Sequence, residues 1–388
     1  MKLGAEIQHW FGKAFNTQVL QKKRLQWVDY LRGIAIILVV YRHALFGIER
    51  SKIAIPTFLE NANMIFYSFR MPLFFILSGI FISRSLAKKT VKQLIGIKFE
   101  NLLYPYLVWA FIQVTLQVFF SHFTNSNRGL VDYTYILYHP RNLDQFWYLP
   151  ALFNSSVVFL LVKTKLKPGV WSHLVLALLF YFSSPFFQSV SMISDWMEFY
   201  IFFVIGDAVS EIFFSPTSQK LFQSGKIFLV VLPFFIATQL YYMRHDIGGG
   251  TLNTDIVQIK QNYVDHAYDQ FTFLFIALTG CLTMFNLAFL LQRFRVFPFL
   301  RVLGYHSLYI YVMHVIVTSV VRMILPHALG IHNPTVLLFS GIFFGVMVPV
   351  VVYNLLIKDN VGWFLFSLKK RKSKPQAVPE VRPSVVTM

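Results

Sequence analysis

Long apolar stretches alternate with short polar segments along nearly the whole chain. Each stretch has about twenty residues, the length at which an α-helix crosses the hydrocarbon core of a bilayer. We expect ten spans, at about residues 31–48, 64–86, 102–122, 145–162, 170–187, 197–214, 226–243, 271–292, 304–325 and 335–357. The pattern therefore predicts an all-α, polytopic integral membrane protein with about ten transmembrane helices.

The composition agrees with a membrane protein and excludes other classes. The 388 residues are 56% hydrophobic and only 13% charged, with a mean hydropathy of +0.56, which a soluble globule does not have. The formal net charge of +18 is spread in small clusters between apolar stretches, so no nucleic-acid partner is expected. Cys281 is the only cysteine, which excludes an internal disulfide and a cysteine-based metal site.

The distribution of lysine and arginine predicts which side each loop faces, because short cytoplasmic loops are enriched in both. Every second segment between spans is basic. These proposed inner segments contain Lys22, Lys23, Arg24, Arg84, Lys88, Lys89, Lys92, Lys98, Lys163, Lys165, Lys167, Lys220, Lys226, Arg293, Arg295 and Arg301. The outer segments contain only Arg50, Lys52, Arg128, Arg141, Arg244, Lys260 and Arg322. Both termini are therefore expected in the cytoplasm.

Three parts of the chain follow from this arrangement. Residues 1–27 form a cytoplasmic N-terminal segment, residues 28–357 a ten-helix membrane domain, and residues 358–388 a basic cytoplasmic tail that we expect to be disordered. The longest outer loop, about residues 244–270, contains three consecutive glycines and four aspartates. It is interpreted either as a solvated linker or as a lid that faces a glycan.

The first span carries charged residues at both ends. Residues 28–43 read VDYLRGIAIILVVYRH, and charges beside or inside a membrane segment are costly enough to indicate function. Arg32 and His43 are eleven residues apart, which on an α-helix is three turns plus about 20°, or roughly 16 Å along the axis. Both side chains therefore share one face, with a cation at the inner end and a titratable base toward the outer end.

Arg32 has two interpretations. An isolated arginine at the inner interface is usually an anchor whose charge reaches the headgroups. Alternatively, its guanidinium binds phosphate through a bidentate fork, oriented by Asp29 three residues earlier on the helix. The face shared with His43 favours the phosphate-binding interpretation.

His43 is interpreted as a general base, because imidazole titrates near physiological pH and accepts a hydroxyl proton. The alternative is an interhelical hydrogen bond. Arg70, in the second span, is about as deep as His43, since both lie roughly 8–9 Å from the outer end of their helices. We expect Arg70 to stabilise an oxyanion beside His43. Arg42 points about 100° away from His43 and is a candidate for holding an anionic group.

Later spans carry further polar and aromatic candidates. Residues 145–153 read QFWYLPALF, in which Trp147 and Tyr148 form either an interfacial aromatic belt or a platform for a sugar. Ser307, Tyr311 and His314 are spaced i, i+4 and i+7, so they share one helical face. That stripe is either a set of contacts between helices or the wall of a polar cavity.

The ordered set of motifs resembles the membrane-bound acyltransferase-3 family, which O-acylates sugars of surface glycans. The first motif is Arg32 and His43 with ten residues between them, and the second is the stretch 69–79, in which Pro-Leu-Phe-Phe precedes a Ser-Gly pair. The others are LLYPY at residues 102–106, the string at residues 145–153 and the stripe at residues 304–314. The family often has an arginine immediately before the LLYPY motif, where this chain has Glu100 and Asn101, which leaves Lys98 as the substitute. Within the family the chain looks like the fucose and polysaccharide O-acetyltransferase branch without an appended esterase-like domain.

The resemblance implies a reaction and a set of roles. The donor is acetyl-CoA or another short acyl-CoA from the cytosol, with its phosphates held by Arg32 and Lys98. The acceptor is a glycan or a lipid-linked sugar, bound by Trp147, Tyr148, Ser307 and Tyr311. His43 is the base and His314 lines the path or moves a proton. Membrane lipid surrounds the protein, in a bacterial inner membrane. No bound cofactor or metal is implied, and the zinc motif HExxH is absent.

Two rival functions use the same features differently. A transporter or flippase of a lipid-linked glycan would pass an anionic headgroup along buried cations, but such folds often contain internal repeats, and none is detected. A polytopic glycosyltransferase would need an acidic pair in an outer loop. The first outer loop has only Glu49 and Glu60, eleven residues apart.

Overall fold

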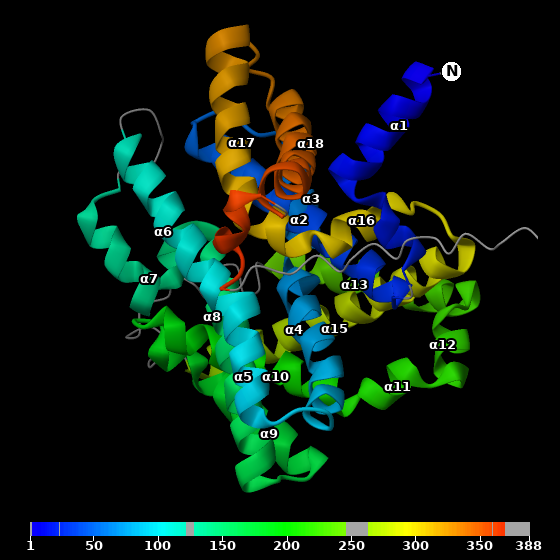
Figure 1. The fold of residues 1–388 in the computed structure, drawn as a ribbon. Coiled ribbons are helices and arrows are strands. Elements are labelled where there is room, and N and C mark those ends of the chain that lie inside the picture. Colours follow the sequence, from blue (N-terminus) through cyan, green and yellow to red (C-terminus); the bar gives the residue numbers. More distant parts are fainter. Residues whose placement is uncertain (1, 23, 122–127, 246–262, 359, 369–388) are drawn as a thin grey trace, which may run out of the picture.

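The computed structural model describes residues 2–22, 24–121, 128–245, 263–358 and 360–368, and all regular structure in these ranges is helical (Figure 1). The α-helices are α1 (Lys2–Phe15), α2 (Gln26–Arg50), α3 (Thr57–Ile65), α4 (Tyr67–Leu86), α5 (Val91–Lys98), α6 (Tyr104–Phe119), α7 (Tyr135–Tyr138), α8 (Tyr148–Leu161), α9 (Val170–Ser183), α10 (Ser191–Ala208), α11 (Ser210–Phe214), α12 (Pro216–Phe222), α13 (Gly225–His245), α15 (Tyr263–Phe294), α16 (Phe299–Tyr305), α17 (Ser307–Leu329) and α18 (Pro334–Val352). The 3-10 and π turns are η1 (Thr17–Gln21), η2 (Phe99–Leu103), η3 (Leu130–Thr134), η4 (Pro140–Trp147), η5 (Val162–Leu166), η6 (Ser184–Phe187), η7 (Tyr353–Ile357) and η8 (Val361–Leu365).

The helices confirm an all-α polytopic membrane protein. Within the described ranges, nine helical stretches are long and apolar enough to cross a membrane, and they match nine of the ten expected spans. The remaining span, about 197–214, falls on α10, which contains Asp195, Glu198 and Asp207 and ends at Ala208. Composition alone does not mark α10 as a span, yet it packs along α4, α8 and α9 like the other bundle helices.

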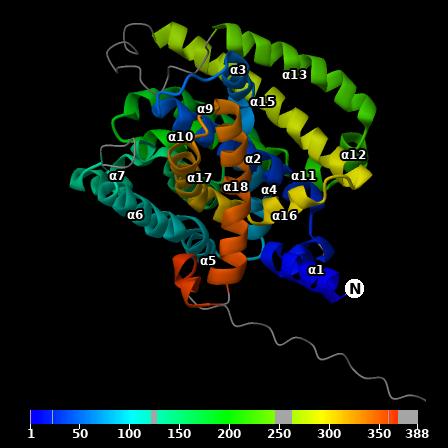
Figure 2. The same cartoon turned by 90° about the horizontal axis from the view of Figure 1, so that it is seen from above.

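Helix α2 lies at the centre of the bundle. It contacts α4, α15, α16, α17 and α18, and most of its residues are buried, including Trp27, Leu31 and Val40. Figure 2 shows α6 and α13 at opposite sides of the periphery. Leu229 and Phe234 of α13 are exposed, and so extensive an apolar surface fits contact with lipid rather than water.

Glycines allow two close crossings between helix backbones. A Cβ atom on Gly79 of α4 would collide with the carbonyl oxygen of Phe203 on α10, and one on Gly206 of α10 would collide with that of Ile76. Gly33 and Gly304 have the same role where α2 crosses α16. Small residues are typical of such contacts in membranes. The hydrophobic effect does not drive helices together in lipid, and small residues allow the close van der Waals packing that does.

The first part of the expected C-terminal tail is docked on the bundle. Tyr104 donates a 2.5 Å hydrogen bond to the carbonyl of Phe364, and the indole of Trp109 donates a 3.2 Å bond to that of Leu365. Both acceptors belong to η8, so this stretch is not the free chain that we expected. Residues 369–388 of the tail and 246–262 of the long outer loop lie outside the described residues.

The glycine crossing predicts a position-specific cost. Gly79→Ala should destabilise the protein by about 1–3 kcal/mol, because an extra methyl group cannot be accommodated against a backbone carbonyl. Gly96→Ala is the matched control, since a Cβ at Gly96 meets nothing within 4 Å. Thermal unfolding of the purified variants in detergent measures both, and equal melting temperatures would disprove the tight α4–α10 crossing.

The orientation of α10 has its own test. In a Cys281→Ser background, Ser189→Cys and Thr217→Cys place exposed cysteines just before α10 and just after α11. A membrane-impermeant maleimide should label Ser189→Cys on intact cells and Thr217→Cys only after permeabilisation. Labelling of both positions from one side would mean that α10 does not cross the membrane.

Candidate functional site

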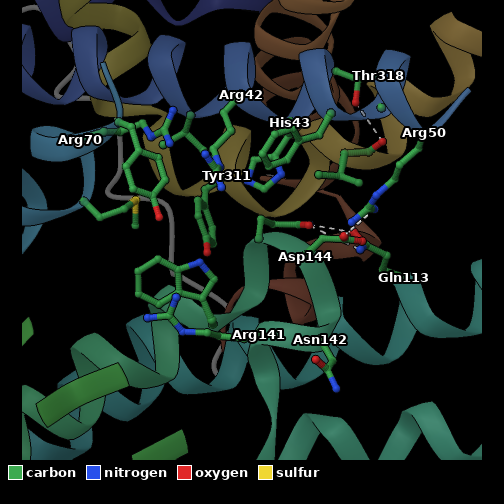
Figure 3. A pocket seen from close by; sticks show the side chains of 18 of the residues that line it. Arg42, His43, Arg50, Arg70, Gln113, Arg141, Asn142, Asp144, Tyr311 and Thr318 are labelled. Atoms are coloured by element: carbon green, nitrogen blue, oxygen red, sulfur yellow. Dashed lines mark hydrogen bonds and ion pairs between the residues drawn. The ribbon is translucent and has the colours of Figure 1, made fainter. Parts of the chain in front are cut away.

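A cavity of about 920 Å³ opens among the ends of several helices. Its wall is formed by the C-terminal halves of α2, α6 and α17, the N-terminal part of α4, and residues of η4, α10 and α15. This size is within the range of small-molecule sites. In the predicted topology these ends face the outer half of the membrane. Figure 3 shows Arg42, His43 and Arg70 together on one side, and Arg141 across from them.

His43 lies in the wall next to His314, and the centroids of the two imidazole rings are 5.1 Å apart. His314 is fully buried, with Nδ1 2.7 Å from the carbonyl oxygen of Tyr311 and 3.0 Å from that of Ile310. Carbonyl oxygens only accept hydrogen bonds, so Nδ1 carries the hydrogen. In the neutral ring Nε2 is then an acceptor, and it has no partner within the described residues. The two histidines therefore form a pair in which one nitrogen is left free to bind a proton.

Arg70 and Arg42 flank the same tyrosine. Arg70 is 2% exposed, and its Nη1 donates a 3.0 Å hydrogen bond to the carbonyl of Leu38 on α2. The guanidinium of Arg42 lies 4.5 Å from the ring centroid of Tyr67, and that of Arg70 lies 5.6 Å from it. Among the described residues, neither guanidinium forms an ion pair. Both line the cavity within electrostatic range of His43.

The other cations of the wall are mostly neutralised. Arg141 pairs closely with Asp195 and, at 2.7 Å, with Glu198, and its guanidinium stacks 4.6 Å from the ring of Trp147. Trp147 thus lines the cavity, but Arg141 covers part of its aromatic surface.

Arg50 pairs with Asp144 at 2.8 Å. Asp144 has a backbone φ of 56°, an unusual conformation for a residue with a side chain, at the kink in η4. That kink turns its carboxylate toward Arg50, as Figure 3 shows.

Arg32 and Lys98 come together away from this cavity. They lie within electrostatic range of each other, and neither lines the cavity. The expected pairing of Arg32 with Asp29 is wrong, because the Asp29 carboxylate instead accepts bonds of 3.0 and 2.9 Å from Arg24. Arg32 therefore forms no ion pair within the described residues.

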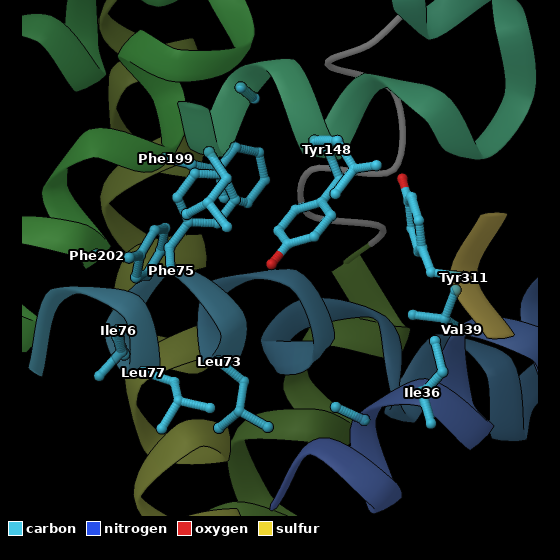
Figure 4. Packing of buried hydrophobic residues seen from close by; sticks show 14 of the residues in the cluster. Ile36, Val39, Leu73, Phe75, Ile76, Leu77, Tyr148, Phe199, Phe202 and Tyr311 are labelled. Atoms are coloured by element: carbon cyan, nitrogen blue, oxygen red, sulfur yellow. The ribbon is translucent and has the colours of Figure 1, made fainter. Parts of the chain in front are cut away.

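Two tyrosines connect the Arg32 region with the cavity. Tyr148 lies within electrostatic range of Arg32, and its ring centroid is 5.4 Å from that of Tyr311. Tyr311 lines the cavity and Tyr148 does not. Figure 4 shows the two rings edge to face, with the Tyr148 hydroxyl directed away from Tyr311. Ser307 begins α17 and is also outside the cavity wall.

The sequence interpretation missed several residues of the wall. Arg141, Glu198 and Arg322 were not singled out, although charges in or next to predicted spans were present in the sequence as a signal. The residues that it overlooked in the wall include Arg50, Tyr67, Gln113, Arg141, Asp144, Gln145, Glu198 and Arg322. Arg42 was considered but not included in the site.

Comparisons with known proteins agree with the motifs. The profile of the acyltransferase domain of the acyltransferase-3 family matches residues 25–354. Among curated proteins, the nodulation protein NolL of Sinorhizobium fredii is 33% identical over 137 residues, which are 35% of each chain. The nodulation protein NolL of Mesorhizobium japonicum is 28% identical over 144 residues, 37% of each chain. The chain thus spans about a third of the length of these relatives. No solved structure matches.

The paired and unpaired arginines of the cavity should differ in their effect on stability. Arg141→Gln should cost about 3 kcal/mol or more, because it leaves the buried carboxylate of Asp195 and the partly buried one of Glu198 without their cation. Arg42→Gln should leave stability within about 1 kcal/mol or raise it, because it removes a partly buried charge that has no ionic partner within the described residues. Thermal unfolding of the two variants in the same detergent gives the comparison. Equal destabilisation by both would assign Arg42 a structural role.

Proposed function

The chain belongs to the acyltransferase-3 family and is a membrane acyltransferase, and from that premise we propose that it is an O-acyltransferase of glycans. It transfers an acetyl or other short acyl group from cytosolic acyl-CoA to a sugar hydroxyl of a cell-surface or exported glycan. The observation that carries the proposal is the position of His43 in the wall of a large cavity, on the same central helix as Arg32 and beside the buried His314 of α17.

The donor is assigned to the inner end of α2. Arg32 and Lys98 lie within electrostatic range of each other and neither forms an ion pair within the described residues, and guanidinium and ammonium groups bind phosphate. The phosphates of acyl-CoA fit such a pair. The pantetheine arm would then cover the roughly 16 Å from Arg32 to His43. The arm would pass Tyr148 and Tyr311, which lie between Arg32 and the cavity. We therefore expect these two side chains to change position when the donor binds.

His43 removes the proton of the acceptor hydroxyl. The hydroxyl oxygen attacks the thioester carbonyl carbon, and the resulting oxyanion is stabilised by the positive charge of Arg70. The carbon–sulfur bond then breaks, and the thiolate of CoA takes the proton from His43, which leaves free CoA and the sugar ester. His314 would help by accepting a hydrogen bond from an N–H of His43 at its free Nε2 during the reaction, which would hold the base in one tautomer; the two rings do not make this bond in the structure. His314 then acts on the base rather than on the substrate.

The acceptor is assigned to the outer cavity. Gln113 and Gln145 contribute paired amides to its wall, with Gln145 Nε2 2.7 Å from Gln113 Oε1. Amides and the edge of Trp147 suit sugar hydroxyls and rings. The matched relatives come from bacteria, and we propose the bacterial inner membrane as the location.

The proposal assigns CoA binding to Arg32 and acyl transfer to His43, so substitutions at the two positions should have different effects. Arg32→Ala should weaken CoA binding about 10- to 150-fold, the equivalent of losing a charge-assisted hydrogen bond of roughly 1.5–3 kcal/mol. His43→Ala should bind CoA normally and transfer no acyl group. Calorimetry with CoA and mass spectrometry of the acceptor glycan measure the two effects.

Arg84→Ala is the control for this pair. Arg84 is a surface cation near the inner end of α4, paired only with the exposed Glu211, and its loss should change neither quantity. Equal loss of CoA binding in the Arg32 and His43 variants would contradict the division of roles, and transfer by His43→Ala at the wild-type rate would end its role as base.

A further inference from the structure

One end of the outer cavity has more positive charge than the proposed acyl transfer needs, because Arg42 lies beside Arg70 and has no role in that reaction. Arg42 and Arg70 lie beside the ring of Tyr67, within electrostatic range of each other. Among the described residues, no carboxylate forms an ion pair with either. Within the described residues, the guanidinium of Arg42 contacts aromatic rings, at 4.2 Å from the ring centroid of Phe46 and 4.5 Å from that of Tyr67.

The surrounding groups do not remove this surplus. Arg141 is also within electrostatic range of Arg42, but its charge is already matched by Asp195 and Glu198. Glu49 is the acidic group within electrostatic range of Arg42, and its side chain is exposed to solvent rather than paired with it. The end of the cavity near Tyr67 therefore keeps the charge of two guanidinium groups.

A partly buried guanidinium without an ionic partner is costly, which is a reason to expect an anion from outside the chain. Within the described residues no hydrogen bond uses the N–H donors of the Arg42 guanidinium, which is partly buried in the cavity wall, and a planar guanidinium pairs with phosphate through two parallel hydrogen bonds. Arg70 has already used Nη1 on the Leu38 carbonyl. Arg42 is thus the group best suited to bind the anion directly, with Arg70 adding attraction.

The anion does not belong to the donor as we have placed it. Arg42 is ten residues beyond Arg32 on α2, or about 15 Å along the helix axis. The thioester end of acetyl-CoA, which would lie near His43, is uncharged. With this donor, an anion at Arg42 comes from the acceptor.

We propose that the acceptor carries a phosphate group close to the hydroxyl that is acylated, and that Arg42 binds this phosphate. The inference rests on the proposed function, because it assigns the outer cavity to the acceptor. Such a phosphate belongs either to a lipid-linked sugar or to a phosphorylated glycan. Arg42 then positions the acceptor sugar, and its hydroxyl, beside His43 without taking part in the proton transfer.

The test is a binding measurement that needs no turnover. The full-length protein in phosphatidylcholine nanodiscs is titrated with octyl phosphate, methyl phosphate and the neutral octyl glucoside. Octyl phosphate should bind wild type and should bind Arg42→Gln roughly tenfold or more weakly. Arg42→Lys should fall between, because it keeps the charge and loses the planar fork. Octyl glucoside binding should be the same in all variants.

Arg322→Gln is the matched control. Arg322 also lines this cavity and forms no ion pair within the described residues, but it lies against Gly47 and near Arg50 and Asp144. Its replacement should leave octyl phosphate binding unchanged. Preference for octyl over methyl phosphate would identify a lipid-linked acceptor, and equal binding a phosphorylated glycan.

A second titration, with acetyl-CoA already bound, separates this inference from the proposed function. Octyl phosphate should bind as before, because the two ligands occupy different ends of α2. Displacement by CoA, or wild-type affinity in Arg42→Gln, would overturn the acceptor-phosphate site while leaving acyl transfer intact. If acetyl-CoA fails to bind but octyl phosphate binding depends on Arg42, the donor assignment fails and the phosphate site stands.

Discussion

The cost of burying charge along α2 constrains the rest of this structure. The central helix carries Asp29, Arg32, Arg42 and His43 through the bundle, where each charge needs a partner. Asp29 is fully buried and is satisfied by Arg24. Because Asp29 pairs with Arg24, the charge of Arg32 stays available at one end of the helix. At the other end, no carboxylate of the described residues pairs with Arg42, so its charge also stays available. The two ends of α2 therefore each present a cation that forms no ion pair within the described residues.

Close backbone crossings fix the depth of these charges. At Gly33 and Gly304 the backbones of α2 and α16 meet without intervening side chains, and Gly79 and Gly206 do the same for α4 and α10. Such contacts allow little sliding, because any shift brings a carbonyl oxygen against a Cα. Arg70 on α4 is held level with Leu38 on α2 by the same packing, as their 3.0 Å hydrogen bond shows. Tyr148 and Tyr311 then fill the space between the two charged ends.

The spans and the positions of the charged residues along them were predictable, because they follow from the length and periodicity of single helices. The alternation of apolar and polar stretches gave the spans, and a rise of 1.5 Å per residue gave the separation of Arg32 and His43 and the equal depth of Arg70. The motif order gave the family, which the profile over residues 25–354 confirms. Span counting was weakest at α10, because Asp195, Glu198 and Asp207 make a packed interior helix look too polar for a membrane.

Only the tertiary structure decided which charges remain free. Arg141 pairs with Asp195 and Glu198, which lie 54 and 57 residues away in sequence. Asp29 pairs with Arg24, in the segment before α2, rather than with Arg32 on its own helix. Arg42 lies in the cavity wall against the ring of Tyr67, which belongs to a different helix. The sequence determined which charged groups enter the membrane and how deep they lie. Their partners depend on helix rotation and crossing, which arise from packing between segments far apart in the chain and have no local signature.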